Sequence, residues 1–485
     1  MNTPALNNHS PIIPSPEESG LRGEVAIFNS QAKNQLSVKL TTASERKEKL
    51  KKLKSAIIAN EKAILEALQK DLRKNSFEAA VFEVFFIYAE IDFAIKNLSE
   101  WMRPQTVPSN LLNLMTRCEI HYEPKGLCLI IAPWNYPFQL LMSPLVSAIA
   151  AGNCCILKPS ELSPATSCII AKIIKETFNE NEIAVIEGDA SVSSKLLNLP
   201  FNHIFFTGST RIGKIVMAEA AKHLATVTLE LGGKSPVIVD TKVNLEKAAA
   251  KIAWGKLANA GQTCIAPDYV FVHESQQEKF ISLLKEAVER KYYDKGQINK
   301  GDYGKIISDN HFKRLKNLVD DAIKKGSSVK MGGIFEEADR TIHPTIITNV
   351  SSDSSIMQEE IFGPVLPVVS YKDISEVINY INAHDKPLAL YIFSNSKRNI
   401  KNIINQTSAG GTCVNDVMIH ISNPHLSFGG VNASGIGGSH GFHGFKVFSH
   451  ERSIMYQSRW IDIGKIIYPP YNSKGMILKL LRKLM

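Results

Sequence analysis

Residues 126–137 have the sequence GLCLIIAPWNYP, in which a glycine precedes an unbroken apolar run. Such a run is typical of a strand buried on both faces of a parallel sheet. Further apolar strands are predicted at 154–157, 183–186 and 203–206, with a helix at about 210–223. This alternation of strands and helices predicts a doubly wound α/β lobe.

A second alternation follows in the next part of the chain. Strands are predicted at 237–239 and 269–272, and helices at 245–257 and 277–291. Before the first lobe, residues 32–101 repeat apolar positions at spacings of three and four, which predicts several helices. We therefore expect two α/β lobes in a chain of 485 residues, which is long enough for more than one core.

The composition restricts the class of protein. Hydrophobic residues make up 44% and charged residues 21% of the chain, an ordinary globular balance. The net charge is +9, but no basic stretch is interleaved with aromatic residues or spaced like a zinc finger, so we expect no nucleic-acid partner and no metal. The seven cysteines include no CxxC pair, which favours the reducing cytoplasm.

Neither the start of the chain nor its most apolar stretch resembles a membrane segment. Residues 1–30 contain a stretch rich in Pro, Asn and Ser, and we expect a disordered tail rather than a signal peptide. Residues 136–157 are interrupted by Pro144 and Gly152, which favours a buried helix running into a strand. We expect no transmembrane helix.

Residues 203–213, HIFFTGSTRIG, predict a strand, a tight turn and a helix. The backbone N–H groups at the start of such a helix can bind a pyrophosphate. Ser209 stands where the usual dinucleotide fingerprint has its middle glycine. An ordinary glycine-containing turn is the alternative.

Three other segments carry residues suited to catalysis. Cys264 lies in AGQTCIAP (260–267), on a loop that would present a thiolate, and a buried structural cysteine is the alternative. Glu230 ends a strand before two glycines, where burial would make it a general base; a capping or ion-paired carboxylate is the alternative. Asn135 follows the 127–132 strand, where its amide could face an oxyanion or cap the next helix.

With Lys158–Glu161 and QEEIFGPV at 358–365, these segments form an ordered set along the chain. The sequence resembles the aldehyde dehydrogenase superfamily, and is most similar to its class-three branch of fatty and aromatic aldehyde dehydrogenases. The resemblance extends over about Ala32–Pro470 and includes segments at 133–137, 230–236, 261–269, 302–307, 358–367 and 448–452.

The resemblance implies a division of the chain. Two doubly wound α/β lobes would bind the cofactor and carry the catalytic residues, with a small β element for oligomerisation. The NAD(P)-binding domain would comprise 31–115 and 127–229, and the catalytic domain 230–412. Residues 116–126 and 445–458 would be the oligomerisation strands, with the strand at 446–457 pairing with 117–123, and 459–485 would be a C-terminal tail. A homodimer is implied.

The catalytic roles follow from the same resemblance. Cys264 matches the nucleophile that adds to the aldehyde carbon to give a thiohemiacetal, and Asn135 matches the amide of the oxyanion hole. Loss of hydride to the nicotinamide then leaves a thioester. Glu230 matches the residue that activates water to hydrolyse it.

The resemblance also implies a cofactor site. Lys158 and Glu161 match contacts to the adenosine ribose, and Glu360 a contact to the nicotinamide ribose. The whole implied set is Trp134, Lys158, Glu161, Gly208, Ser209, Gly213, Glu360 and Phe362. We expect NAD, because the Glu161 carboxylate would repel a 2′-phosphate, with NADP as a possible second cofactor. Asn415 matches a position near the substrate pocket.

The match departs from the family at the glycine-rich segment SFGGVNASG (427–435). Family members more often have Pro in place of Ser427 and Gly in place of Asn432. Asparagine tolerates a positive φ, so we expect the turn to be kept.

The branch suggests medium or long aliphatic and aromatic aldehydes as substrates. Two alternatives remain: a CoA-acylating aldehyde dehydrogenase, against which Glu230 argues, and an inactive binding protein with the same fold.

The C-terminal segment 475–485 is predicted to be a basic amphipathic helix. At about 1.5 Å per residue it would be far too short to cross a bilayer. It would lie on the anionic inner face of a membrane, or dock on its own protein or a dimer partner. Its apolar side comprises Met476, Ile477, Leu480, Leu481, Leu484 and Met485, and its basic side Lys479, Arg482 and Lys483.

Overall fold

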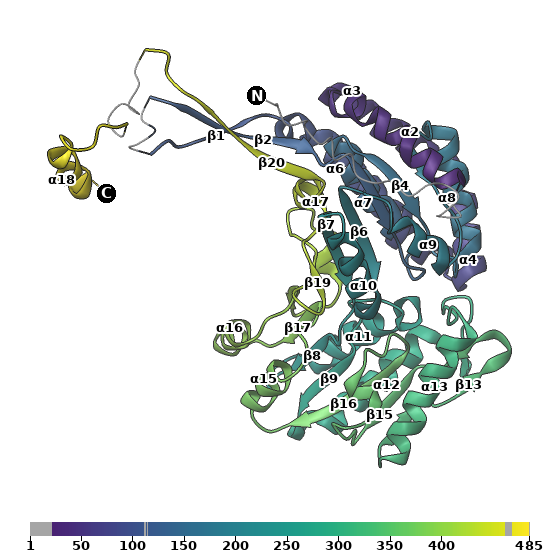
Figure 1. The fold of residues 1–485 in the computed structure, drawn as a ribbon. Helices are drawn as coiled ribbons and strands as arrows, with labels where there is room; N and C mark the ends of the chain where they lie inside the picture. The colour runs from purple at the N-terminus through teal and green to yellow at the C-terminus, as the bar shows by residue number, and fades with distance from the viewer. Residues whose placement is uncertain (1–21, 111–112, 114, 461–467, 485) are drawn as a thin grey trace.

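The computed structural model describes residues 22–110, 113, 115–460 and 468–484. Figure 1 shows two α/β lobes, one above the other, and a long β arm that projects from the upper lobe. The predicted fold class, two doubly wound α/β lobes with a small β element, is confirmed.

The upper lobe is built on a six-stranded sheet. Its strands are parallel except β19 (Gly435–Ile436), an edge strand that runs antiparallel to its neighbour. Their order is β19 (Gly435–Ile436), β7 (Thr226–Leu231), β6 (His203–Gly208), β3 (Leu127–Ile131), β4 (Cys154–Lys158) and β5 (Ile183–Val185).

The apolar run at 127–131 explains why helices cover both faces of this sheet. Successive side chains of a strand point to opposite faces, and Cys128 and Ile130 join one hydrophobic cluster whereas Leu127, Leu129 and Ile131 join another. The first cluster includes residues of α3 (Ala43–Ala59), α4 (Glu61–Leu72), α6 (Phe85–Trp101), α7 (Gln139–Ala151) and α8 (Pro164–Thr177). The second includes residues of α2 (Arg22–Lys39), α9 (Ala190–Leu196) and α10 (Thr210–Ala221).

Helix α2 corrects the prediction of a disordered tail at 1–30. Residues 22–30 lie in this helix, because Val25 and Phe28 are buried against the upper sheet. The Phe28 ring meets the Phe201 ring edge to face, with centroids 5.1 Å apart. Residues 1–21 lie outside the described part of the chain.

The lower lobe contains a seven-stranded sheet. The order is β12 (Ser328–Met331), β15 (Thr345–Thr348), β16 (Val365–Tyr371), β9 (Tyr269–His273), β8 (Pro236–Val239), β17 (Ala389–Phe393) and β18 (Gly411–Val414). Its helices include α11 (Leu245–Leu257), α12 (Gln277–Tyr292), α13 (Asp309–Lys324), α15 (Ile374–Asn382) and α16 (Lys397–Gln406). The four elements predicted here are confirmed.

The chain passes between the two sheets at two places. Strand β7 ends at Leu231 in the upper sheet, and β8 begins at Pro236 in the lower one. After β18 the chain returns to the upper sheet as β19. The boundaries at 230 and 412 that the resemblance implied therefore fall inside β7 and β18.

The arm is a three-stranded antiparallel sheet of β1 (Gln105–Val107), β2 (Arg117–Pro124) and β20 (Ser449–Tyr456). The predicted pairing is confirmed, with Arg117 opposite Tyr456 and Pro124 opposite Ser449. Two details of the prediction were wrong. Residues 446–447 close helix α17 (Gly441–Val447), and β1, placed in the cofactor domain, belongs to the arm. Helix α18 (Gly475–Leu484) lies beyond the arm (Figure 1).

The helices within the described ranges are all too short or too polar to cross a membrane.

We expect Phe28→Ala to lower the free energy of unfolding by about 3 kcal/mol, because it removes a fully packed ring and leaves a cavity under α2. Thermal unfolding measures the loss. Phe77→Ala is the matched control, since the Phe77 side chain is 76% exposed. Equal melting temperatures for the two variants would contradict the packing of α2.

Candidate active site

A left-handed turn presents Cys264 between helix α11 and strand β9. Asn259 and Ala260 both have a φ of 51°, and Gly261 has a φ of 75°. A Cβ on Gly261 would lie 2.3 Å from the carbonyl oxygen of Gly363, so only glycine fits there. The turn ends α11 and brings the chain back toward the seam between the lobes.

The buried Gln262 side chain fixes this loop. Its amide donates to the carbonyl oxygens of Asn259 (3.1 Å) and Lys305 (3.0 Å), and its oxygen accepts from the Ile307 N–H (3.0 Å). The Gln262 side chain thereby ties the loop that carries Cys264 to the backbone of neighbouring segments.

Cys264 opens onto a mostly apolar cavity of about 170 Å³. The upper lobe contributes Val81 and Phe82 from a π-helical turn (Ala80–Val84), and π turns of this kind are frequent at functional sites. The other apolar or aromatic side chains of its wall are Phe86, Tyr136, Leu140, Trp254, Ile265, Met418, Ile419, Ile421 and Phe428. The cavity suits an apolar group attached to a carbon that reacts with the thiol.

The thiol of Cys264 is protonated at neutral pH in this setting. Burial raises its pKa above the ordinary value, and the carboxyl groups of Glu360 and Glu230 raise it further. Hydrogen bonds from the backbone N–H groups of Cys264 and Ile265 act in the opposite direction. For this sulfur to act as a nucleophile, a nearby base would have to take its proton.

Glu230 is the buried carboxyl group at the end of β7. Its side chain accepts a hydrogen bond from Ser439 Oγ on one oxygen and from Thr207 Oγ1 (3.4 Å) on the other. Burial raises its pKa to about 7, although both hydroxyl groups favour the charged form. Near neutral pH, Glu230 can both accept and release a proton.

Asn135 follows β3 and belongs to a buried polar network. Its side-chain Nδ2 donates to the Gln262 carbonyl oxygen (3.0 Å), two residues before Cys264. Its own carbonyl oxygen accepts from Lys74 Nζ (3.1 Å) and Asn259 Nδ2 (2.8 Å). Lys74 in turn pairs with the buried Glu83.

Glu83 also holds the start of helix α7, since its carboxylate accepts from the N–H groups of Phe138 (2.9 Å) and Gln139 (3.2 Å). Lys74 and Glu83 are site residues that the sequence did not single out. Their nine-residue separation across a π-helical turn matches no short helical spacing.

The predicted pyrophosphate turn joins β6 to α10. Ser209 is the N-cap of α10, where its Oγ accepts from the Ile212 N–H (3.4 Å). A Cβ on Gly213 would lie 2.7 Å from a methyl carbon of Leu231, so glycine lets the helix pack tightly on β7. At the end of β4, Lys158 Nζ lies 3.8 Å from a carboxylate oxygen of Glu161, whose side chain is 44% exposed.

Trp134, His311 and Phe362 form an aromatic cluster across the seam. The Trp134 ring meets the other two edge to face, each at 5.4 Å between centroids. His311 Nε2 and the Phe362 carbonyl oxygen are 2.9 Å apart, and Phe362 has a φ of 52°. The cluster holds the backbone of the 358–365 segment in place.

Glu360 packs against the link between the two sheets. A Cβ on Gly232 would lie 2.0 Å from Glu360 Oε2, so the missing side chain makes room for the carboxyl group. The Gly233 N–H donates to this carboxyl group, and burial raises its pKa to about 8. A hydroxyl-bearing ribose fits such a carboxyl group, and the α10 N-terminus fits a diphosphate; the residues present therefore fit a dinucleotide.

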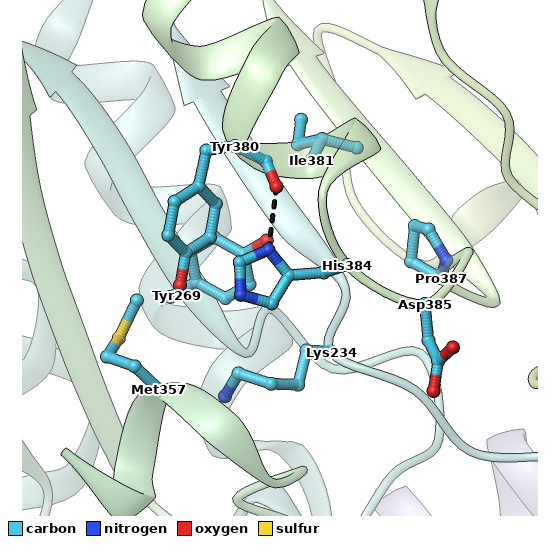
Figure 2. A pocket seen from close by; sticks show the side chains of 8 residues that line it. All are labelled: Lys234, Tyr269, Met357, Tyr380, Ile381, His384, Asp385 and Pro387. Atoms are coloured by element: carbon cyan, nitrogen blue, oxygen red, sulfur yellow. Dashed lines mark hydrogen bonds between the residues drawn. The ribbon is translucent and has the colours of Figure 1, made fainter. Parts of the chain in front are cut away.

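Lys234 and Asp268 hold the segment that precedes Glu360. Lys234 Nζ contacts the Asp268 carboxylate and donates to the carbonyl oxygens of Ile356 (2.7 Å) and Glu359 (2.9 Å). Asp268 accepts from the Ile361 N–H (2.9 Å). Figure 2 shows Lys234 below the rings of Tyr269 and His384, with Met357 beside its end. The cavity there, about 10 Å³, holds at most a water molecule and no substrate.

Asn415 does not join the residues around Cys264. Its amide is engaged with Ser394, donating to that residue's carbonyl oxygen (3.1 Å) and accepting from its N–H (3.0 Å). The cavity is instead lined by Met418, Ile419 and Ile421, a few residues farther along. The expectation that Asn415 borders the substrate pocket is not supported.

Comparison with known proteins agrees with this geometry. The model of the aldehyde dehydrogenase family matches residues 18–454. The chain belongs to the aldehyde dehydrogenase family. This aldehyde dehydrogenase uses NAD(P) to oxidise aldehydes to carboxylic acids, and its resemblance to the class-three branch is confirmed.

Relatives of this aldehyde dehydrogenase span nearly its whole length. It is 44% identical to the 4,4′-diaponeurosporen-aldehyde dehydrogenase of Staphylococcus aureus over 94% of this chain and 96% of that protein. It is 45% identical to aldehyde dehydrogenase family 3 member A2 of Mus musculus over 89% of this chain and 88% of that protein. A solved Staphylococcus aureus AldH structure in a substrate-bound state has a TM-score of 0.91 and 43% identity, covering 95% of this chain and 99% of that one.

We expect Lys234→Met to raise the KM for NAD about tenfold with a smaller effect on kcat, because the Glu360 segment loses a charged anchor worth about 1.5–3 kcal/mol. Steady-state kinetics with varied NAD measures both constants. Lys372→Met is the control, since the Lys372 side chain is 75% exposed and 3.9 Å from Glu274. Unchanged KM in both variants would contradict the anchoring role.

Proposed function

We propose that Cys264, Glu230 and Asn135 carry out the oxidation, and that the preferred substrates are medium or long aliphatic and aromatic aldehydes. The observation that carries the proposal is the position of Cys264 at the wall of an apolar cavity, in electrostatic contact with the buried Glu230. The cavity would bind the apolar part of the aldehyde, and its carbonyl carbon would meet the sulfur.

In the first step, the Cys264 thiol loses its proton and the sulfur forms a bond to the carbonyl carbon. A base with a pKa of about 7, such as Glu230, is well matched to accept that proton. The carbonyl oxygen becomes an alkoxide. The Cys264 N–H and the second N–H of the Asn135 amide would stabilise it, because the first already binds Gln262.

The cofactor supplies an acceptor for the hydride that leaves the thiohemiacetal carbon. The residues that would hold it are Trp134, Lys158, Glu161, Gly208, Ser209, Gly213, Glu360 and Phe362. The Glu161 carboxylate favours NAD over NADP, since it would repel a 2′-phosphate.

Before the last step, the proton that Glu230 accepted from the thiol would pass to solvent. Glu230 would then take a proton from water, whose oxygen attacks the thioester carbon. The C–S bond breaks to release the acid, and the departing Cys264 sulfur takes the proton back from Glu230 to become a thiol again. This step needs the carboxylate form of Glu230. The deacylation rate should therefore rise with pH through about 7. A base at this position distinguishes hydrolysis from transfer of the acyl group to CoA, which requires no activated water.

We also propose a cytoplasmic homodimer assembled through the arm. Strand β20 is at the edge of the arm sheet and carries mostly exposed side chains, including Met455 and Tyr456. An exposed strand edge with apolar side chains is a ready surface for pairing with a second chain.

We expect Glu230→Gln to slow deacylation by about a hundredfold or more, because water lacks a base, and to let the thioester accumulate. Intact-mass spectrometry after one turnover with hexanal and NAD detects the adduct. Cys264→Ala is the control: it should bind NAD but form no adduct. An unmodified Glu230→Gln enzyme with normal steady-state turnover would overturn the assignment.

We propose that helix α18 contacts an anionic membrane surface. The side chains of Met476 and Leu478 are 84% and 55% exposed, and Lys479, Arg482 and Lys483 are exposed as well. Exposed apolar and basic side chains on one short helix are typical of interfacial binding. Met485, part of the predicted apolar side, lies outside the described residues.

We expect the full chain to sediment with vesicles of anionic phospholipid, and a chain ending at Tyr471 to stay in solution, because the three basic side chains of α18 are each worth about 1 kcal/mol at such a surface. Vesicles of neutral lipid are the control. Equal sedimentation of both proteins would exclude α18 as the contact and favour docking on protein.

A further inference from the structure

Each oxygen of the buried Glu230 carboxyl group accepts a hydrogen bond from a different hydroxyl group. Ser439 Oγ donates to Oε1 in a short contact, and Thr207 Oγ1 donates to Oε2 at 3.4 Å. Ser439 is itself 5% exposed, and water therefore does not compete for its proton. Ser439 has no part in the acylation and deacylation steps themselves.

The Ser439 hydroxyl has a second acceptor within reach. The carbonyl oxygen of Phe428 lies 3.4 Å from Ser439 Oγ. A hydroxyl group has one proton to donate, so it serves either Glu230 or Phe428. If Glu230 turns away, the proton of Ser439 still has a partner, and the cost of an unsatisfied buried donor, about 1–3 kcal/mol, is avoided.

We propose that Ser439 is a positioning residue that latches Glu230 in its resting place, and that its hydrogen bond passes to the Phe428 carbonyl when Glu230 turns toward the thioester. This inference rests on the proposed role of Glu230 as the base that activates water. No covalent bond changes in the switch.

Backbone hydrogen bonds keep the Phe428 carbonyl oxygen close to Ser439, whichever way the Glu230 side chain turns. The Phe428 N–H donates to the Ser439 carbonyl oxygen (3.2 Å), and the Ser439 N–H donates to the Phe428 carbonyl oxygen. A Cβ on Gly429 would lie 2.2 Å from the Gly437 carbonyl oxygen, so glycines allow the two segments to press together. Asn432 turns the chain between them with a φ of 55°.

The latch also adjoins the acyl site. Phe428 lines the cavity beside Cys264, and its ring stacks on the His440 ring at 5.2 Å. Ser439 thus contacts both the Glu230 carboxyl group and Phe428, which lines the cavity. Contact between the latch and the acyl group would occur at Phe428.

Ser439 also sets the charge of Glu230. Burial raises the pKa of Glu230, and the hydrogen bonds from Ser439 and Thr207 lower it. Charge on Glu230 raises the pKa of the Cys264 thiol, and charge on Glu360 raises that pKa as well. The residues opposite Glu230 in the sheet, Thr207 on β6 and Gly435 on β19, carry no charge. Loss of the Ser439 hydroxyl should raise the pKa of Glu230 further, so the carboxylate form would begin at higher pH.

The test is the pH dependence of deacylation in Ser439→Ala. The full-length enzyme is mixed with NAD and one equivalent of hexanal; stopped-flow absorbance of NADH reports acylation, and quenched-flow mass spectrometry reports decay of the thioester. We expect the midpoint of the decay rate to move up by about half to one pH unit. Well above that midpoint, decay should be at least as fast as in the wild type, because the freed base is stronger and needs no unlatching.

Three further variants make the outcome decisive. Ser434→Ala removes a buried hydroxyl group of the same glycine-rich segment. Within the described part of the chain this hydroxyl group bonds Val431 and not Glu230, so the midpoint should not move. Thr207→Val should give a smaller shift in the same direction, because its contact is longer. Glu230→Gln tests the base itself: if its thioester decays normally, the proposed function fails.

If Glu230→Gln slows decay but Ser439→Ala only slows it at every pH without moving the midpoint, Ser439 is merely structural and the latch is overturned. An equal shift in Ser434→Ala would overturn it as well, since the effect would then come from the segment as a whole.

Discussion

The short link at 232–235 between the two parallel sheets is the constraint on which the site depends. Because β7 ends in the upper sheet immediately before β8 begins in the lower one, the lobes cannot separate at this point. Glu230 lies just before the link, and Gly232 within it leaves room for Glu360. The same link carries Lys234, which pins the segment ahead of Glu360. The link thus brings Glu230 of the upper lobe and Glu360 of the lower lobe close enough to Cys264 for both carboxyl groups to raise the pKa of its thiol.

Burying Glu230, Glu360 and Cys264 near one another makes the charged form of each group less favourable. The two carboxyl groups have raised pKa values, and each raises the pKa of the Cys264 thiol. Burial disfavours the charged form of each of the three groups, and negative charge on either carboxyl group further disfavours the Cys264 thiolate. The buried Lys74–Glu83 pair fixes the opposite wall without adding net charge. Near neutral pH, Glu230 and Glu360 can therefore each gain or lose a proton, because their pKa values are about 7 and about 8.

The sequence was informative where the chemistry is local and silent where it depends on distant segments. The apolar run at 127–132 and the alternation of strands and helices after it predicted both sheets. A strand that is buried on both faces is a continuous apolar run, which can be recognised in the sequence. Cys264, Glu230 and Asn135 could be named, but only through a resemblance, since each alone had a structural alternative. Lys74 and Ser439 could not be found from the sequence, because their roles depend on residues far away in the chain. Lys74 contacts Asn135, and Ser439 contacts Glu230. Helix α2 was missed at its start because its apolar stripe is thin and interrupted by polar residues.

Part of the wall of the cavity beside Cys264 comes from segments that hold none of the groups proposed to react. Val81 and Phe82 lie in a π-helical turn, and Met418, Ile419 and Ile421 lie in a segment after β18. Cys264, in contrast, lies on the loop that Gln262 holds, and Glu230 lies in strand β7. Substitutions in these walls can alter the width and length of the space while the reacting atoms keep their positions. Natural variation in these segments can therefore change which aldehydes the enzyme accepts without altering the groups proposed to react, since the two sets of residues lie in different parts of the chain.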